Sequence, residues 1–212
     1  MQADEPRDDT IHRLLALGAA TIGESGGRPT APRLKPAWSG ARVAGPAHTA
    51  ACPAGDNLAI HVAVAQAAPG SVLVVEIGPG DPYGYWGEVL TTGAQARGLL
   101  GLVIDGGVRD VDAVAARGFP VFAATVALRG AQKVGPGTMG HPVVVGEVEV
   151  CQGDWIVGDT DGVAVIAAAD LDTVLAAGQA RADKEQGLFR ALEAGQTTVD
   201  LFGLDPSAID TS

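Results

Sequence analysis

Two short runs of apolar residues, rich in valine, leucine and isoleucine, limit what this chain can fold into. Ser71 to Ile77 (SVLVVEI) and Leu99 to Ile104 (LLGLVI) each have the length of a strand, and neither alternates between apolar and polar residues. Such runs are typical of parallel strands that are covered on both faces. A helical pattern precedes the second run and another follows it, so the first two-thirds of the chain predicts an α/β fold with one layered core.

The last third is expected to be β-rich and then helical. Val143 to Ile166 carries short apolar segments separated by turns, a spacing typical of antiparallel strands, and residues 169–195 follow a helical pattern. At the other end, we expect Met1 to Asp9 to be disordered and Thr10 to Leu17 to form a helix that ends at Gly18. This divides the chain into an N-terminal helix and loop, a core, and a C-terminal helix and tail: residues 1–40, 41–168 and 169–212.

Composition narrows the classes of function. Hydrophobic residues make up 47% of the chain and the mean hydropathy is +0.21, which favours burial between subunits in addition to a core. The formal net charge of −11 argues against nucleic acid as a partner, because phosphate binding needs a basic surface. We see no targeting segment and no run of about 20 apolar residues that would cross a membrane. Cys52 and Cys151 have no metal-site spacing, so we expect two buried, reduced thiols in a cytoplasmic protein, with a disulfide as the alternative.

The stretch from Gly87 to Asp112 brings together the residue types that chemistry needs. The run ending at Ile104 is followed by a glycine-rich segment, which we interpret as a turn, and then by Arg109 and Asp110. Ligands favour the crevice beyond the carboxyl ends of strands in such sheets. Asp110 stands where an N-cap carboxylate would stand, and the predicted helix start at Gly87 offers backbone N–H groups to an anion.

These residues support a site for a small 2-oxo acid. A carboxylate at Asp110 or Glu88 can hold Mg²⁺, which needs only one or two protein carboxylates, and Arg109 can bind a substrate carboxylate through two N–H groups. A structural interpretation explains the same residues. In it Asp110 only caps its helix, and Arg109 pairs with Glu88 or Asp105. Spacing alone favours this second interpretation.

Four segments together resemble the RraA-like family: VIDGGVRD, the upstream GEVL, and the later FPVFA and GDWIVGDTDGVAVI. This family includes the class II, metal-dependent 4-hydroxy-4-methyl-2-oxoglutarate / 4-carboxy-4-hydroxy-2-oxoadipate aldolases. The resemblance runs from about Ala41 to about Ile166, and it includes an acidic residue followed by twenty residues and Arg-Asp, here Glu88 and Arg109-Asp110. Several family aldolases carry another acid two residues after this motif, where this chain has Ala113. Family members without the full pattern include regulators that bind ribonuclease E.

The resemblance implies a swivelling β/β/α sandwich that assembles as a homotrimer or hexamer with sites at subunit boundaries. It implies an aldolase that cleaves 4-hydroxy-2-oxo acids to pyruvate and a second oxo acid, with oxaloacetate decarboxylase side activity. Asp110 would bind Mg²⁺ or Mn²⁺, Glu88 would orient a metal-bound water, and Arg109 would stabilise the enolate. The substrate carboxylate would be held by the helix start, which consists of Gly87, Glu88, Val89 and Leu90. The alternatives are a protein-binding regulator or a lyase for another 2-oxo acid.

Other polar residues have simpler interpretations. Asp56 can cap the helix that follows it, although it resembles a family segment near the site. His48 and His61 are expected to be structural. Lys133 invites a Schiff-base mechanism, but its glycine-rich surface loop promises no burial that would lower the lysine pKa, so we reject that mechanism.

Overall fold

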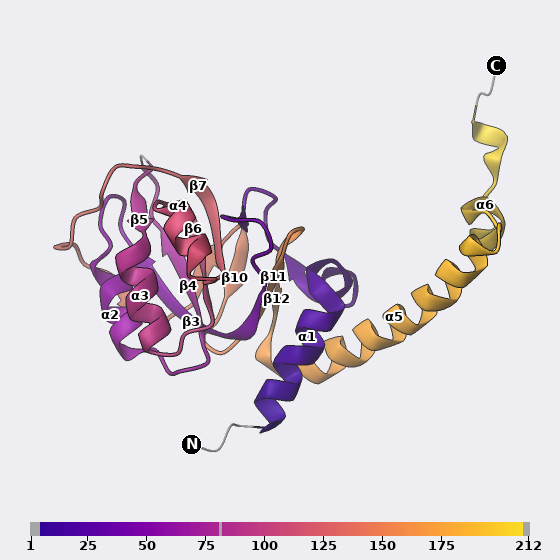
Figure 1. Ribbon diagram of the computed structural model, residues 1–212, viewed down its shortest axis with the longest axis horizontal. Helices are drawn as coiled ribbons and strands as arrows, with labels where there is room; N and C mark the ends of the chain where they lie inside the picture. The colour runs from indigo at the N-terminus through magenta and orange to yellow at the C-terminus, as the bar shows by residue number, and fades with distance from the viewer. Residues whose placement is uncertain (1–4, 81, 210–212) are drawn as a thin grey trace.

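Four parallel strands form the centre of a mixed sheet in the computed structural model, which describes residues 5–80 and 82–209 (Figure 1). In sheet order they are β3 (Val43–Cys52), β4 (Val72–Ile77), β6 (Gly101–Val108) and β7 (Val121–Val126). The register aligns Val74 of β4 with Thr49 on one side and with Val103 on the other. The predicted strands at 71–77 and 99–104 correspond to β4 and β6, so they are confirmed, and the α/β class with them.

Antiparallel strands extend the sheet at both edges and fold over one of its faces. Beyond β3 lie β11 (Trp155–Asp159), β12 (Gly162–Ile166) and β1 (Arg28–Pro29), and beyond β7 lies β2 (Lys35–Pro36). The hairpin of β9 (Val143–Val145) and β10 (Val148–Val150) packs near β4, and β8 (Thr138–Met139) pairs with β3. The antiparallel strands predicted between residues 143 and 166 are confirmed. Cys52 and Cys151 are both free thiols; Cys52 is buried as expected, but Cys151, which follows β10, is exposed.

The two faces of the central sheet pack against different layers. Leu73 and Val75 on β4 belong to a cluster with α2 and α3, whereas Val72 and Val74 face the antiparallel strands. All four side chains are fully buried, which explains why this run carries no polar residue on either face. The order of layers is β, β, α, as the family resemblance implied.

Three helices cover the first of these faces (Figure 1). They are α2 (Leu58–Gln66), α3 (Glu88–Ala96) and the short α4 (Val111–Ala116). The predicted helix starts at Glu88 and at Asp110 are confirmed, because Asp110 stands immediately before Val111 as the N-cap residue.

The glycine-rich segment after Ile104 was predicted as a turn, and this prediction is wrong. Strand β6 continues through this segment to Val108, because β5 (Gly84–Trp86) lies parallel beside its end. A Cβ atom on Gly107 would lie 2.4 Å from the carbonyl oxygen of Tyr83, so a glycine permits this close approach. The glycines therefore admit a neighbouring strand instead of reversing the chain.

The terminal helices pack together beside the sheet. Helix α1 (Glu5–Glu24) already begins inside the segment that we expected to be disordered, and residues 1–4 lie outside the described range. The backbone leaves the helical conformation at Gly18 (φ 80°, ψ 164°), where the first helix was predicted to end, so α1 consists of two helices joined at a kink. The N–H of Ala19, just after the kink, donates to Asp159 Oδ2 at 2.8 Å. Among the described residues, no helix is both long enough and apolar enough to cross a bilayer.

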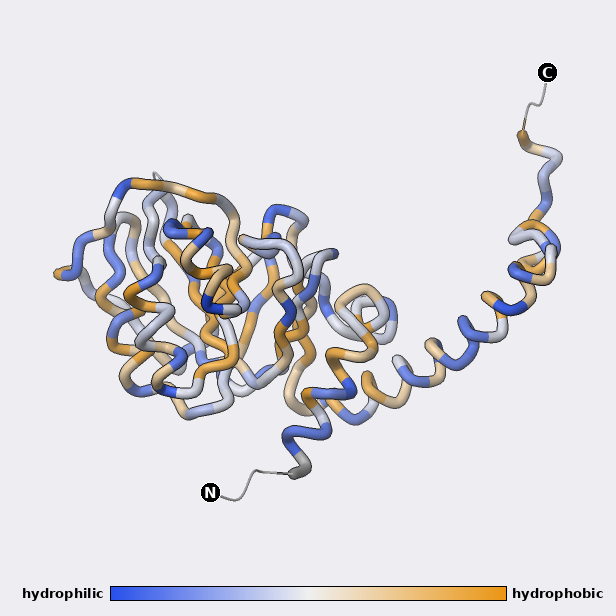
Figure 2. The backbone as a smooth tube through the Cα atoms, viewed as in Figure 1, coloured by the Kyte–Doolittle hydropathy of each residue, from blue (hydrophilic) through white to orange (hydrophobic). Residues whose placement is uncertain are grey.

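Helix α5 (Leu171–Glu193) packs on α1 and then runs away from the body toward α6 (Thr198–Phe202) (Figure 1). Its buried residues all lie in its first third, ending at Gly178. Beyond that point Figure 2 shows hydrophobic residues interspersed with hydrophilic ones along the helix. We refer to residues 187–209 as the C-terminal arm.

Candidate functional site

The ends of β5 and β6 deliver two helix starts to the same place. β5 leads through Gly87 into α3, and β6 leads through Arg109 and Asp110 into α4. The N–H of Arg109 donates to the carbonyl oxygen of Trp86 at 2.8 Å, so the β6–α4 connection is hydrogen-bonded to the β5–α3 connection. The expectation that Gly87 and Arg109-Asp110 lie together is met in this geometry.

Asp110 has an unusual backbone and caps an unexpected helix. Its φ and ψ of 56° and 36° are left-handed, a conformation that aspartate and asparagine tolerate better than most residues. Its side chain makes no cap bond to α4; instead, Oδ2 accepts a hydrogen bond from the N–H of Glu88 at 3.1 Å. The carboxylate therefore lies at the positive end of α3, where negative charge is favoured.

Gly87 is required by this arrangement. A Cβ atom at this position would lie 2.3 Å from Asp110 Oδ2 and 3.2 Å from Cγ of Arg109. Because no side chain fits at that distance, the glycine allows the carboxylate to reach the helix start. The GEVL motif thus begins with the residue that makes room for the Arg-Asp motif.

Arg109 is not bound by the partners that the structural interpretation gave it. Arg33 binds Asp105 through two N–H groups, at 3.0 and 2.7 Å. Arg117 donates to Oε1 of Glu88 at 3.0 and 2.9 Å. Arg109 lies instead beside Asp110, with its Nε 3.8 Å from Oδ2, and both side chains are 43% exposed. An exposed pair of this kind is weak, so the guanidinium stays available to a ligand.

These residues border a cavity of about 290 Å³. Of the residues expected to form the site, Gly87, Val89, Leu90, Arg109 and Asp110 line it. Glu88 does not, because its carboxylate points to Arg117 and its N–H group is taken by Asp110. The first N–H groups of α3 that remain for an anion are therefore those of Val89 and Leu90.

The structure adds three polar residues to the cavity that sequence reasoning did not assign to it. Lys133 comes from the long connection after β7, and Asn57 and His61 come from the start of α2. Lys133 is exposed, as expected for its loop, yet it lines the cavity together with Arg109. The sequence signal nearest to these residues was Asp56, which we interpreted as the cap of the helix that follows it.

Aromatic residues build the inner wall of the cavity. Trp86 is 1% exposed, stacks on Phe119 with ring centroids 6.0 Å apart, and donates from Nε1 to Thr91 Oγ1 at 2.7 Å. Tyr85 accepts a hydrogen bond at its carbonyl oxygen from Asn57 Nδ2 at 2.7 Å. These contacts hold the β5–α3 connection rigid, so that the helix start and Asp110 are held in place before any ligand arrives.

Burial is the main reason that His61 favours its neutral form. Burial lowers the pKa of His61, the Lys133 ammonium lowers it further, and Asp56 opposes both. Its Nε2 is buried without a hydrogen-bond partner among the described residues. A neutral imidazole and an ammonium group therefore face the same cavity as Arg109 and Asp110.

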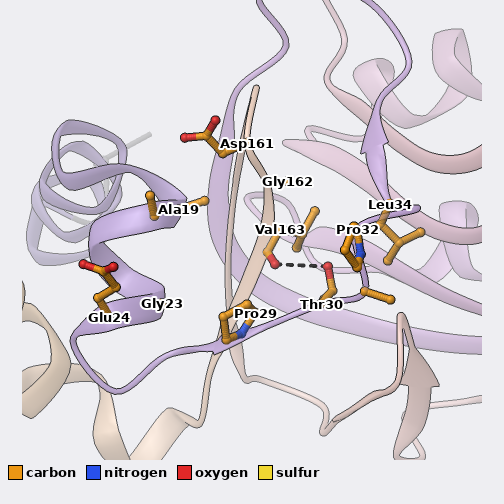
Figure 3. Close-up of a pocket in the computed structure, with 12 residues that line it drawn as sticks. Ala19, Gly23, Glu24, Pro29, Thr30, Pro32, Leu34, Asp161, Gly162 and Val163 are labelled. Atoms are coloured by element: carbon orange, nitrogen blue, oxygen red, sulfur yellow. Dashed lines mark hydrogen bonds between the residues drawn. The ribbon is translucent and has the colours of Figure 1, made fainter. Parts of the chain in front are cut away.

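A second cavity, of about 270 Å³, lies between α1 and the segment that follows β1 (Figure 3). Most of its lining is apolar, as in Pro29, Pro32 and Leu34, and its two charged residues, Glu24 and Asp161, are both acidic. An anionic substrate would be repelled there. The cavity at Arg109 is therefore the better candidate for a small organic acid.

The cavity offers a divalent cation one protein carboxylate as a ligand. No cluster of three or more histidine, cysteine, aspartate or glutamate side chains occurs within residues 5–80 and 82–209. Asp110 offers one carboxylate there, and the hydrogen bond from the start of α3 occupies its Oδ2 and not its Oδ1. Mg²⁺ keeps several waters and often takes one protein carboxylate plus substrate oxygens, so this donor set matches magnesium and not a structural zinc site.

Comparison with known proteins gives consistent matches over most of the chain. A sequence profile described as "RraA-like: Aldolase/RraA" matches residues 12–165. A protein of Halalkalibacterium halodurans named "Putative 4-hydroxy-4-methyl-2-oxoglutarate aldolase" is 33% identical over 159 residues, which cover 75% of this chain and 76% of that protein.

Solved structures resemble the fold over most of the chain. An uncharacterized protein from Pseudomonas syringae pv. tomato superposes with a TM-score of 0.79 at 25% identity, covering 90% of this chain and 91% of that one. Streptomyces coelicolor RraAS2, described as an unusual member of the RNase ES inhibitor RraA protein family, gives a TM-score of 0.73 at 25% identity, covering 87% and 98%.

Proposed function

The chain belongs to the RraA-like family, and we propose that it is a divalent-metal-dependent aldolase. Its substrates would be 4-hydroxy-2-oxo acids, which it would cleave to pyruvate and a second oxo acid. The observation that carries this proposal is the meeting of Asp110, Arg109 and the α3 start on one cavity. Asp110 has a left-handed backbone, and its carboxylate caps α3 at the cavity wall instead of capping its own helix.

The reaction requires the protein to stabilise negative charge. When the C3–C4 bond breaks, its electron pair moves to C3 and into the 2-oxo group as an enolate. The 4-hydroxyl group loses its proton and becomes the new oxo group, and C3 is then protonated to give pyruvate. Arg109 supplies a fixed positive charge that stabilises the enolate. Electrostatic stabilisation of this kind is usually the largest single contribution to catalysis.

The chain's own groups also bind and orient the substrate. The N–H groups of Val89 and Leu90 receive a carboxylate at the positive end of α3. Lys133 adds a second cation across the same cavity. His61 presents a neutral imidazole that can accept or return a proton near the cavity wall. Glu88 acts through its backbone, because its carboxylate is paired with Arg117.

Asp110 would hold Mg²⁺ or Mn²⁺, and a bound metal supplies Lewis-acid polarisation of the 2-oxo group. Oxaloacetate loses carbon dioxide through the same pyruvate enolate, so decarboxylation is the expected side activity. A test of the main reaction is to incubate the protein with 4-hydroxy-4-methyl-2-oxoglutarate and Mg²⁺ and to follow products by proton NMR. Cleavage yields two pyruvate molecules per substrate. A spectrum that stays unchanged in the presence of the metal rejects the aldolase proposal.

A protein-binding regulator is the second candidate, and two observations favour it. Ala113 stands where several family aldolases carry a further acid, and RraAS2 covers 87% of this chain in a superposition. A pull-down against a ribonuclease of the E type, run beside the NMR assay, separates the two. Capture of the ribonuclease without any pyruvate would favour regulation.

We also propose that the chain forms a homotrimer or a hexamer. Apolar side chains on the C-terminal arm stand in solvent, including Phe189, Phe202 and Ile209 at 47%, 54% and 67% exposure. Exposed apolar residues gathered on a projecting segment mark a candidate subunit contact. The arm therefore supports an assembly in which it packs on a neighbouring copy.

A further inference from the structure

Asp56 is a buried carboxylate to which the proposed reaction assigns no role. It lies in the turn between β3 and α2 and is 5% exposed. Its Oδ1 accepts a hydrogen bond from the N–H of Leu58 at 2.8 Å, as a residue at a helix start commonly does. Helix capping explains this oxygen and leaves the other one unexplained.

The second oxygen of Asp56 binds a segment that lies far along the chain. Oδ2 accepts the backbone N–H groups of Val134 and Gly135, both at 2.7 Å. Hydrogen bonds from backbone N–H groups to a carboxylate are short and strong, and two of them here converge on one oxygen. The carboxylate thus ties down the residues immediately after Lys133.

Backbone pairing secures the residue on the other side of Lys133. The N–H of Asn57 donates to the carbonyl oxygen of Gln132 at 2.9 Å, and the N–H of Gln132 donates to Gly55 at 2.8 Å. The segment from residue 132 to residue 135, which we call the lysine segment, is therefore bound on both sides of its lysine.

Apolar packing does not hold the lysine segment in place. Residues 132–134 are exposed, and the side chain of Val134 is 80% exposed. A Cβ atom on Gly135 would lie 3.0 Å from Cγ of Asp56, so the glycine permits the close approach. The hydrogen bonds to Asp56 are therefore a main restraint on where Lys133 points.

We propose that Asp56 is a positioning residue for the candidate site. Its carboxylate holds the lysine segment so that the Lys133 ammonium faces the cavity and helps to bind an anionic substrate. The inference rests on the proposed function, because it needs an anion in the cavity. It makes the affinity for an anionic substrate depend on Asp56, which helix capping alone would not do.

The electrostatics of Asp56 agree with this role. Burial by itself raises the pKa of the Asp56 carboxyl, but N–H bonds from Leu58, Val134 and Gly135 and the charge of Lys133 outweigh it, so the pKa is lowered. The group is ionised at neutral pH and can accept all three bonds.

The test measures binding without turnover, with oxalate as the probe. Oxalate is a stable dianion shaped like the pyruvate enolate, and calorimetry in MgCl₂ gives its affinity for the wild type, Lys133→Met, Asp56→Asn and the double variant. We expect each single variant to bind oxalate about tenfold more weakly, because one charge-assisted contact is lost or displaced. The double variant should be no weaker than Lys133→Met, since Asp56 acts through Lys133.

Two further variants control for general damage. Gly135→Ala keeps the carboxylate but blocks its approach, so it should weaken oxalate binding as Asp56→Asn does. Asp154→Asn alters another buried carboxylate that binds backbone N–H groups, those of Cys151 and Ala168, outside the cavity, and it should bind oxalate like the wild type. Amide exchange at Val134 and Gly135 should accelerate in Asp56→Asn and not in Lys133→Met.

The outcomes separate this inference from the proposed function. Wild-type binding of oxalate together with unchanged binding by Asp56→Asn overturns the positioning role alone. Additive losses in the double variant also overturn it, because Asp56 would then act independently of Lys133. Failure of the wild type to bind oxalate in MgCl₂ counts against the proposed function, and the positioning role falls with it.

Discussion

Asp110 Oδ2 accepts a hydrogen bond from the N–H of Glu88 at 3.1 Å, so the residue that opens α4 caps α3. Through this bond the two halves of the motif, an acid and an Arg-Asp pair twenty residues later, contact one another. The contact joins the backbone of the first half to the side chain of the second. The carboxylate of Glu88 faces away, toward Arg117.

Replacing Asp110 separates its structural role from its proposed chemical one. Asp110→Asn keeps an oxygen for the Glu88 N–H and tolerates the left-handed backbone, so its unfolding free energy should stay near that of the wild type. Its Mg²⁺-dependent pyruvate release should fall by at least about a hundredfold, because the anionic ligand is gone. Asp110→Ala should lose the same activity and also about 2 kcal/mol of stability in urea unfolding, from the missing cap and the strained backbone. An Asn variant as active as the wild type would rule out metal binding by Asp110.

Glu88→Gln should have little effect on turnover. The carboxylate pairs with Arg117 at the surface, with side-chain exposures of 46% and 35%, and does not line the cavity. We expect kcat/KM to stay within about threefold of the wild type and stability to fall by no more than about 1 kcal/mol. Steady-state kinetics on oxaloacetate checks this. A hundredfold loss would show that Glu88 leaves Arg117 and enters the reaction, as the sequence motif alone led us to expect.

His48 should make the fold sensitive to mild acid. Its Nδ1 lies 3.2 Å from Gln152 Nε2, while Gln152 Oε1 accepts the N–H of Thr49 at 2.9 Å, so Nδ1 must act as an acceptor. Burial lowers the pKa of His48 from its ordinary value of 6.5. Stability is therefore fully present above pH 6.5 and is lost as the pH falls through the lower folded pKa.

Melting temperatures measured from about pH 7.5 to about pH 5, the range in which histidine titrates, check this prediction. His48→Asn keeps an acceptor for Gln152 but does not titrate, so its melting temperature should fall less on acidification. His12→Asn, at an exposed position on α1, is the matched control and should behave like the wild type. Equal acid sensitivity in all three proteins would exclude His48 as the cause.

Removing the C-terminal arm should dissociate the assembly and spare the core. A chain that ends at Gln186 loses the exposed Phe189, Phe202 and Ile209 but keeps the buried part of α5 up to Gly178. Light scattering after size exclusion should show a smaller particle, and circular dichroism should show the native sheet. An unchanged particle mass would place the subunit contact elsewhere.

Much of the scaffold could be predicted because local patterns and tertiary packing agree there. The run from Val72 to Val75 is apolar on both faces, and the structure covers both faces. The segment after Ile104 was misinterpreted because two glycines are typical of a turn. Whether they turn the chain or admit a neighbour depends on β5, a partner that no local pattern reveals.

The site was predicted in part for a similar reason. Arg109 and Asp110 follow directly from a strand end, so their position could be inferred from one segment. Lys133 lines the cavity from a loop in which the next residue, Val134, donates to Asp56, 78 residues away in the sequence. No sequence motif reveals a contact between residues so far apart. The direction of the Glu88 side chain likewise depends on a residue outside its own segment, Arg117.

The proposed chemistry is tested most directly by the rate of pyruvate release from oxaloacetate, measured for the wild type and Asp110→Asn in MgCl₂ and again after EDTA. We predict turnover by the wild type in MgCl₂, its loss in EDTA and its recovery when magnesium is restored, with Asp110→Asn inactive throughout. Turnover that is indifferent to EDTA, or no turnover in magnesium, would contradict a metal-assisted reaction at Asp110 and Arg109.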